Sequence, residues 1–474
     1  MKNIWSILLS VIVVTSCTDL ESFNVDEKNA TTAAPETFFS NAQFNLAKEV
    51  FNVSYTASGP GASRMFAQHI TAVTYIEGTR YIKAFNWTPL YRDVLADLKA
   101  GKDILQASET TNADEESLKN NKLALFDLMS IYTYANLVDS YGNIPYSEAL
   151  DFNNPLPVFD DAQTVYVDLM SKLDDVIARL SPAAGNFGNA DLIYKGNTAL
   201  WLKFANSLKL RMGMRIIDVL PDLATTAVSS AINSGMLIQD NSENTLFHYL
   251  SESPNTNPWW TTLVRDNLKY YVGTNRFIDY MNSVNDPRIG IYFGDVGGQY
   301  IGGAYGEVIP YASYSPVSDY FRNPTAPSIF FDHSAVEFLL AEAAERGIAT
   351  PSPAQVHYEN AIRASFEYWG ASGVDDYLAQ SNVNYATAPG DWKEKIGLQK
   401  WVALFDQGFE AWTEYRRLDH PSFLQPAPNS ESAVVLKRFT YPISEQTLNG
   451  GSWKQAADAM GGDLYEVPIF WDIH

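Results

Sequence analysis

Cysteine is almost absent from this sequence of 474 residues, in which Cys17 is the only one. A single cysteine excludes a disulfide framework within the chain, so stability must come from a large apolar core. Positive charge is also scarce, because 33 lysines and arginines stand against 55 aspartates and glutamates, which gives a net charge of -22. This balance argues against binding to nucleic acid and against adhesion to anionic lipid, since both depend on basic side chains.

Long apolar runs are missing too, except at the N-terminus, where residues 4–14 follow the positive charge of Lys2. This run of 11 residues is shorter than the ~17 to 25 needed to cross a bilayer, so it predicts a cleaved signal peptide at residues 1–16. Residues 14–17 resemble a lipobox, which predicts that the Cys17 thiol is lipidated and that several acyl chains anchor the protein. The alternative is an ordinary secretory signal that ends near a buried cysteine. Residues 17–34 are polar and acidic, as expected of a flexible tether.

Most of the remaining chain has apolar residues at the three- or four-residue spacing of amphipathic helices. Asp161 is expected to cap the start of one of these helices, which ends before Ser181-Pro182. Helix pairs joined by short polar turns predict a mainly α-helical body, in which the pairs pack as in tetratricopeptide repeats. One short strand is expected at 434–441. The helices are expected at residues 63–76, 87–105, 122–138, 161–180, 199–219, 333–346, 353–369 and 392–417.

Residues 238–332 form an exception, because they contain few long periodic stretches and are rich in Asn, Gly, Pro, Tyr and Trp. Within them, residues 294–306 hold six glycines and no strand-to-helix pattern, which excludes a nucleotide fingerprint. An irregular connection of this length is usually functional. We therefore expect residues 35–474 to form one domain in which 238–332 is a loop-rich insertion carrying the ligand site.

Catalytic and metal-binding motifs are not found in the sequence. The six histidines are scattered, and neither a zinc-binding spacing nor a nucleophile elbow nor a phosphate loop occurs. Glu342 and Glu345 share a helix face, and a carboxylate pair can cleave a glycoside, but pairs on one exposed helix are usually solvated. The sequence therefore predicts a protein without a cofactor or a metal that is not an enzyme, with a glycan-acting hydrolase as an alternative.

Aromatic residues are unusually frequent and supply the candidate ligand-binding residues, since tyrosine, phenylalanine and tryptophan make up 13% of the chain. Flat rings offer their faces to the C–H patches of sugars or to peptide side chains, while nearby polar groups fix orientation. For each ring the alternative is packing against the helical body. One group of candidates is Trp259, Trp260, Tyr270 and Tyr271, and a second is Tyr75, Arg80, Tyr81 and Trp87.

Six stretches together resemble the SusD/RagB family of nutrient-binding outer-membrane lipoproteins of Bacteroidetes, in its shorter SusD-like branch. They follow one another along nearly the whole chain and identify the family, not a substrate. The stretches are RMFAQH at 64–69, YANLVDSYGNIPYSEAL at 134–150, WLKFANSLKLRMGMR at 201–215, NDPR at 285–288, FLLAEAAERG at 338–347 and QKWVALFDQGFEAWTEYRR at 399–417.

This resemblance implies a lipid-anchored, surface-exposed outer-membrane protein that captures an oligosaccharide, or a peptide, and delivers it to a SusC-like TonB-dependent barrel. It implies no site residue by motif, because ligand contacts in the family come from variable loop aromatics. It also implies that four arginines pair with buried helix acids such as Glu342 and Glu414. A helical scaffold that binds only protein remains a further alternative. The four arginines are Arg211, Arg215, Arg416 and Arg417.

Overall fold

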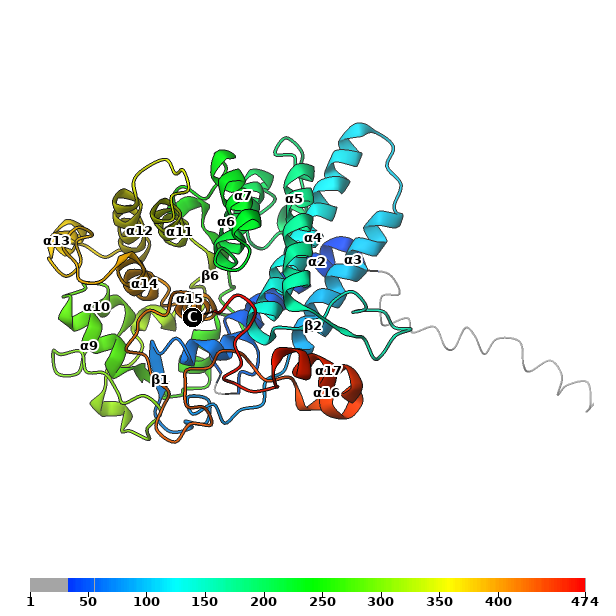
Figure 1. The fold of residues 1–474 in the computed structure, drawn as a ribbon. Coiled ribbons are helices and arrows are strands. Elements are labelled where there is room, and N and C mark those ends of the chain that lie inside the picture. The colour runs from blue at the N-terminus through cyan, green and yellow to red at the C-terminus, as the bar shows by residue number, and fades with distance from the viewer. Residues whose placement is uncertain (1–32, 55, 474) are drawn as a thin grey trace, which may run out of the picture.

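The computed structural model describes residues 33–54 and 56–473, most of which lie in helices (Figure 1). The expected signal peptide, the lipidation site at Cys17 and nearly all of the tether lie outside these residues. A π-helical segment, Leu90–Leu95, leads directly into α3. The longer helices between residues 35 and 369 are α2 (Pro35–Val50), α3 (Ala96–Ala107), α4 (Ala113–Tyr141), α5 (Ala162–Arg179), α6 (Thr198–Arg215), α7 (Pro221–Asn233), α11 (His333–Glu345) and α12 (Ala354–Trp369).

These helices pack as successive pairs, which confirms the expected helical body. The pairs are α2 with α3, α4 with α5, α6 with α7, and α11 with α12. Neighbouring pairs also touch, through α3 and α4, through α5 and α6, and through α6 and α11. The pairs from α3 to α12 therefore lie side by side along the upper edge of the molecule in Figure 1. Because each pair has neighbours, helix α4 is buried on most faces over its second half.

Local sequence signals account for several helix boundaries. Asp161 caps α5 as expected, because its side chain accepts a hydrogen bond from the Thr164 N–H at 2.8 Å. The Asn112, Asn197 and Asp332 side chains accept the same kind of bond at the starts of α4, α6 and α11. Each cap satisfies a backbone donor that the first helical turn cannot satisfy internally.

The remaining elements are short, and those between α7 and α11 occupy the stretch expected to be irregular. Within residues 33–54 and 56–473, three antiparallel strand pairs occur, and each joins segments that are separated in sequence. They are β1 (Ile70–Ala72) with β5 (Tyr271–Gly273), β2 (Ile144–Pro145) with β3 (Phe159–Asp160), and β4 (Thr245–Phe247) with β6 (Ser328–Phe331). The short helices are α8 (Pro258–Trp260), α9 (Asn275–Ser283), α10 (Ile289–Tyr292) and α13 (Val374–Ala379).

Three expectations about secondary structure are wrong. The helix expected at 63–76 is a 3-10 helix, Pro60–Met65, followed by β1, because backbone pairing with β5 outweighs the helical spacing. The helix expected at 392–417 breaks at residues 404–407 into α14 (Trp392–Ala403) and α15 (Gly408–Leu418). The strand expected at 434–441 is irregular, and the chain after it forms α16 (Ile443–Leu448) and α17 (Gly450–Met460).

Buried ion pairs join α6, α11, α14 and α15, as expected for three of the four arginines. Arg211 and Arg215 bind Glu410, and Arg417 binds both Glu342 and Glu414. Glu342 is fully buried in this network, so it is not one of a solvated pair on the helix surface.

Arg416 differs from the other three arginines. Its guanidinium donates to the backbone carbonyls of Lys437 and Asp139, each at 2.8 Å, instead of to a carboxylate. Among the residues that the structure describes, no helix combines the length and the apolar character needed to span a bilayer.

Candidate functional site

The β1–β5 pair brings two of the predicted aromatic groups together. Ala72 pairs with Tyr271, and the Val73 N–H donates to the Tyr270 carbonyl at 3.0 Å. Nearly 200 residues of chain separate these segments, but the pairing fixes their register. The loop that follows β1 is therefore held next to the start of β5, and Tyr75 lies beside Tyr270 with a distance of 6.0 Å between the ring centroids.

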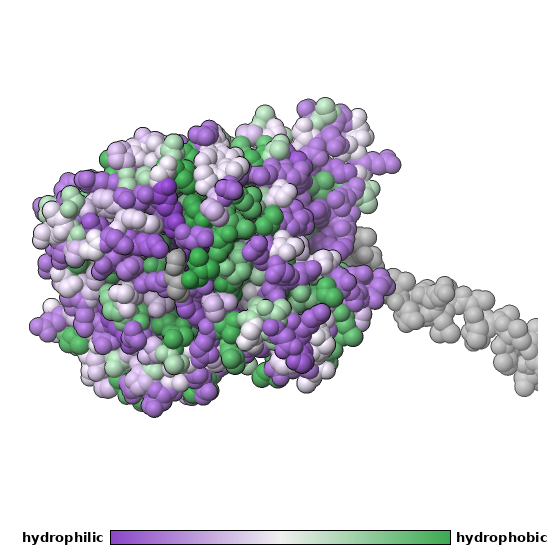
Figure 2. Space-filling view, viewed as in Figure 1, coloured by the Kyte–Doolittle hydropathy of each residue, from purple (hydrophilic) through white to green (hydrophobic). Residues whose placement is uncertain are grey.

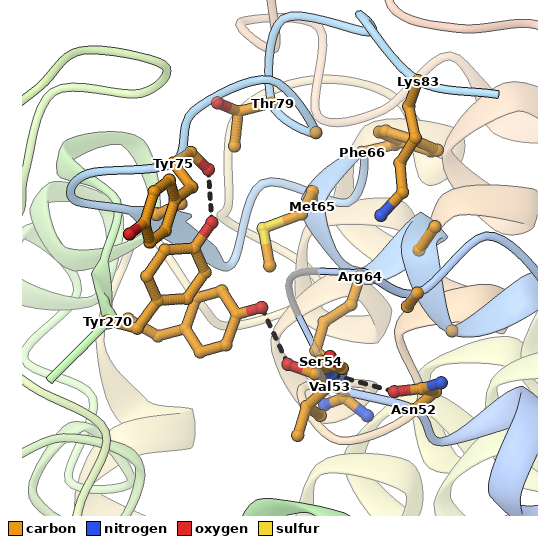
Figure 3. Close-up of a pocket in the computed structure, with 16 residues that line it drawn as sticks. Asn52, Val53, Ser54, Arg64, Met65, Phe66, Tyr75, Thr79, Lys83 and Tyr270 are labelled. Carbon is orange, nitrogen blue, oxygen red and sulfur yellow. Dashed lines mark hydrogen bonds between the residues drawn. The ribbon is translucent and has the colours of Figure 1, made fainter. Parts of the chain in front are cut away.

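These residues line a pocket, here called the tyrosine pocket (Figure 3). Tyr75 and Tyr270 lie at one end, where the Tyr270 hydroxyl donates to the Tyr75 carbonyl. Lys83 extends from the opposite side, and its ammonium group is directed into the space beside Met65. The space inside it that a water-sized sphere can enter is about 20 Å³, enough for about one water molecule, so a larger ligand would lie at its mouth, against Tyr75.

Four predicted aromatic residues form a continuous row that runs from the surface into the core. Tyr75 is 56% exposed, whereas Tyr270, Tyr271 and Trp259 are buried. Tyr270 and Tyr271 have ring centroids 4.5 Å apart, and Tyr271 and Trp259 have theirs 5.9 Å apart. Only the outer end of this row offers a ring face to a ligand.

The structure places Trp259, one of the predicted ligand contacts, in the core. Its ring is 1% exposed, its indole N–H donates to Asp406 at 3.0 Å, and the Arg64 guanidinium lies 5.0 Å from its ring. The adjacent residue, Trp260, is half-buried. The two adjacent tryptophans do not both lie in the core, and Trp260 is the less buried of the pair.

Three further candidates are also core side chains. Tyr271 donates its hydroxyl to the Val53 carbonyl at 2.7 Å, Tyr81 is fully buried against Phe66, and Trp87 is 3% exposed. Their positions in loops suggested exposure. Burying a large ring against the helical body, however, stabilises the folded protein more than leaving that ring in water.

Arg80 connects the loop after β1 to the glycine-rich segment 294–306. Its Nε donates to the Gly306 carbonyl at 2.9 Å, and its guanidinium lies 3.6 Å from the Glu307 carboxylate. Gly306 has a φ of +73°, and a Cβ atom there would lie 2.2 Å from Ala427, so only glycine fits this close approach. The irregular segment therefore positions a half-exposed arginine near the tyrosine pocket.

Sequence reasoning missed the two basic residues that line the tyrosine pocket, Arg64 and Lys83. Arg64 is buried and forms an ion pair with Asp406 at 2.9 Å, and burial raises the pKa of that carboxyl against the lowering effect of Arg64. Burial lowers the pKa of Lys83 to about 8. Arg64 belongs to one of the quoted motifs, whereas nothing local in the sequence marks Lys83.

A second and larger concavity, here called the apolar groove, lies between α3, the loop that joins β2 to β3, and α16. Trp87 lines its floor together with Tyr91, and Phe152 and Leu448 line its rim. Trp87 is the one predicted residue that lines this groove, and the rest of it was missed, although a phenylalanine next to the turn formers Asn153 and Asn154 was a usable signal. Within the described residues no cluster of three or more His, Cys, Asp or Glu side chains is placed to hold a metal ion.

The helix pairs stack into an α-helical scaffold, and the tyrosine pocket lies among its loops. This arrangement is typical of a protein that binds a ligand on its loops. The chain belongs to the SusD-like family, since the family model described as "Starch-binding associating with outer membrane" matches residues 27–442. No protein with a curated function matches the chain.

Solved structures of SusD homologues share this fold. One from Bacteroides uniformis is 26% identical with a TM-score of 0.79, over 92% of this chain and 99% of that one. One from Bacteroides ovatus is 25% identical with a TM-score of 0.76, over 93% and 99%. A chitin-binding SusD homologue from Flavobacterium johnsoniae has the same fold at 24% identity and a TM-score of 0.77, over 93% and 99%.

Proposed function

We propose that this protein binds an oligosaccharide at the tyrosine pocket and delivers it to a SusC-like TonB-dependent barrel in the outer membrane. The observation that carries the proposal is the exposed ring of Tyr75, supported from behind by Tyr270, at the mouth of the tyrosine pocket. The apolar face of a sugar ring can stack on such a tyrosine, while polar side chains next to it bind the hydroxyl groups.

The family supports this proposal, because its model is described as starch-binding. The polar groups around the exposed ring also suit a sugar. Lys83 lines the pocket opposite Tyr75 and supplies hydrogen-bond donors there. A peptide is the second candidate ligand, because the same ring and cation could hold an apolar side chain and a carboxylate.

The location and the partner belong to the same proposal. Residues 1–16 would be removed, Cys17 would carry the lipid anchor, and residues 17–34 would link it to a single binding domain at the cell surface. The family model is described as associating with the outer membrane, which supports this arrangement. Fractionation after Cys17→Ala tests the anchor, since the protein should then leave the membrane fraction. A tagged chain should isolate a barrel protein from solubilised outer membranes.

The two alternatives predict different results. A hydrolase requires two carboxylates that face each other across a cleft, and a scaffold requires no small ligand. Glu342 does not suit the hydrolase, because Arg417 and Arg346 already bind its carboxylate in the core. Recovery of a cleaved oligosaccharide would nevertheless establish the hydrolase.

Calorimetry with starch and chitin oligosaccharides tests the proposal. Tyr75→Ala should weaken binding about tenfold or more, since the loss of ~1.4 kcal/mol of stacking corresponds to that factor. Tyr320→Ala is the matched control, because Tyr320 is a 38% exposed tyrosine of the same loop-rich region that does not line the pocket. If no oligosaccharide binds, or if both variants bind as the unchanged protein does, the proposed site is wrong.

A further inference from the structure

The apolar groove is a larger concavity than the tyrosine pocket. Its walls come from three segments that are far apart in sequence, which are α3 with the preceding π-helix, the β2–β3 loop and α16. Its empty volume is about 1560 Å³, open solvent included. π-Helical turns are rare and occur frequently at functional sites.

Large apolar side chains are exposed at the rim of this groove. Phe152 is 99% exposed and Leu448 is 73% exposed. The walls consist mainly of aliphatic groups, such as Ala100, Leu150 and Pro157. In Figure 2 green surface reaches the side of the molecule on which α16 and α17 lie. Contiguous exposed apolar surface is a mark of a binding site, and aliphatic walls suit an apolar side chain better than sugar hydroxyls, which lose their hydrogen bonds to water there.

The charges along the groove favour a cation. Its two basic residues are already paired, Arg92 with Asp93 at 2.6 Å and Lys99 with Asp103 at 2.5 Å. Asp97, Asp151 and Glu445 also line the groove, and burial raises the pKa of both Asp97 and Glu445. Burial disfavours the ionised form of a carboxylate, and a nearby positive charge stabilises that form.

We propose that the apolar groove binds a short free peptide that carries an aromatic or aliphatic side chain next to a lysine or arginine. The apolar side chain would lie between Phe152 and Leu448, and the cation would pair with Glu445. This second site is independent of the oligosaccharide site proposed above.

Calorimetry with three end-blocked tetrapeptides tests the inference. A Phe-Lys-Phe-Lys peptide should bind saturably, whereas Phe-Glu-Phe-Glu and Ser-Lys-Ser-Lys should each bind at least tenfold more weakly. Phe-Lys-Phe-Lys against Phe-Glu-Phe-Glu measures the contribution of the charge. Phe-Lys-Phe-Lys against Ser-Lys-Ser-Lys measures the contribution of the apolar side chains. Equal binding of the lysine and glutamate peptides, or no saturable binding of the first peptide, would overturn the assignment.

Variants locate the site. Phe152→Ser and Glu445→Gln should each weaken binding of Phe-Lys-Phe-Lys about tenfold, and both should fold, because Phe152 is exposed and Glu445 lies on the short surface helix α16. Leu250→Ser and Glu431→Gln are matched controls, since both are exposed residues outside the groove. An unchanged affinity in Phe152→Ser and Glu445→Gln contradicts the proposal.

Oligosaccharide binding separates this inference from the proposed function. If Phe152→Ser abolishes oligosaccharide binding while Tyr75→Ala leaves it unchanged, the groove is the glycan site and the peptide proposal is wrong. If Tyr75→Ala abolishes oligosaccharide binding and the lysine peptide still binds, both proposals stand. If the oligosaccharide binds and the lysine peptide does not, the inference about the groove is wrong and the proposed function stands.

Discussion

His69 shows how burial fixes the charge state of a single residue. The side chain is fully buried among Phe277, Trp401 and Phe405, and one ring nitrogen contacts the Trp401 carbonyl at 2.9 Å. Burial lowers the pKa of His69 to about 3, partly opposed by that hydrogen bond. The histidine is therefore neutral in the folded protein at neutral pH.

This shift makes stability depend on pH. Between the folded pKa of about 3 and the unfolded value of ~6.5, the unfolded chain binds a proton that the folded chain does not. His69 alone should therefore lower the free energy of unfolding by up to ~1.4 kcal/mol for each pH unit below ~6.5. Urea unfolding from pH 7 to pH 4 measures this slope, which should be shallower in His69→Gln. Parallel curves for the two proteins would show that the histidine does not contribute.

At the scale of the elements, the helices are held in place by buried charge as well as by apolar contacts. Glu414 on α15 accepts from Lys400 at 2.5 Å and Arg417 at 2.7 Å and lies 3.2 Å from Arg215. Although burial opposes ionisation, these three cations hold the pKa of Glu414 well below its usual range. The network spans α6, α14 and α15, so it fixes how these helices are oriented relative to one another.

Removing this carboxylate should be costly, because it leaves buried cations without a partner. Glu414→Gln is expected to reduce the free energy of unfolding by about 3 to 5 kcal/mol. The control is Asp458→Asn, which breaks the exposed ion pair with Lys454 on α17 and should cost less than about 1 kcal/mol. Urea unfolding of both variants checks the difference, and equal small losses would mean that the network does not stabilise the packing.

At the scale of the whole molecule, the C-terminal segment packs against the helical body. Trp471 is 2% exposed, and its indole N–H donates to Asp139 of α4 at 2.8 Å. The guanidinium group of Arg416, on α15, lies 4.8 Å from its ring. One side chain near the end of the chain thus connects two helices that are almost 300 residues apart in sequence.

Trp471→Ala is expected to reduce the free energy of unfolding by about 3 to 5 kcal/mol, because it leaves a cavity and removes a partner of the buried Asp139. Ile473→Ala, two residues further on, changes a 52% exposed side chain and should cost less than about 0.5 kcal/mol. Thermal unfolding of the two variants provides the comparison. A similar melting temperature for both would show that the C-terminal segment is not part of the cooperative unit.

The sequence by itself determined the helical body and much of its boundaries. The spacing of apolar residues and the capping signal of Asp161 are local, since they depend on residues within one or two turns of each other. For this reason α5, α11 and α12 begin and end close to where the pattern placed them. The family was also identified from the sequence, because its motifs are contiguous stretches.

Only the tertiary structure decided which aromatic residues can meet a ligand. Tyr75 and Trp259 look alike in the sequence, since both lie in polar loops, but one is exposed and the other is fully buried. Trp259 is buried by contacts with Tyr271, Phe321 and Asp406, the last of which is 147 residues away in sequence. Burial and long-range pairing are properties of the whole packed chain, so no local pattern could have separated the surface ring from the core ring.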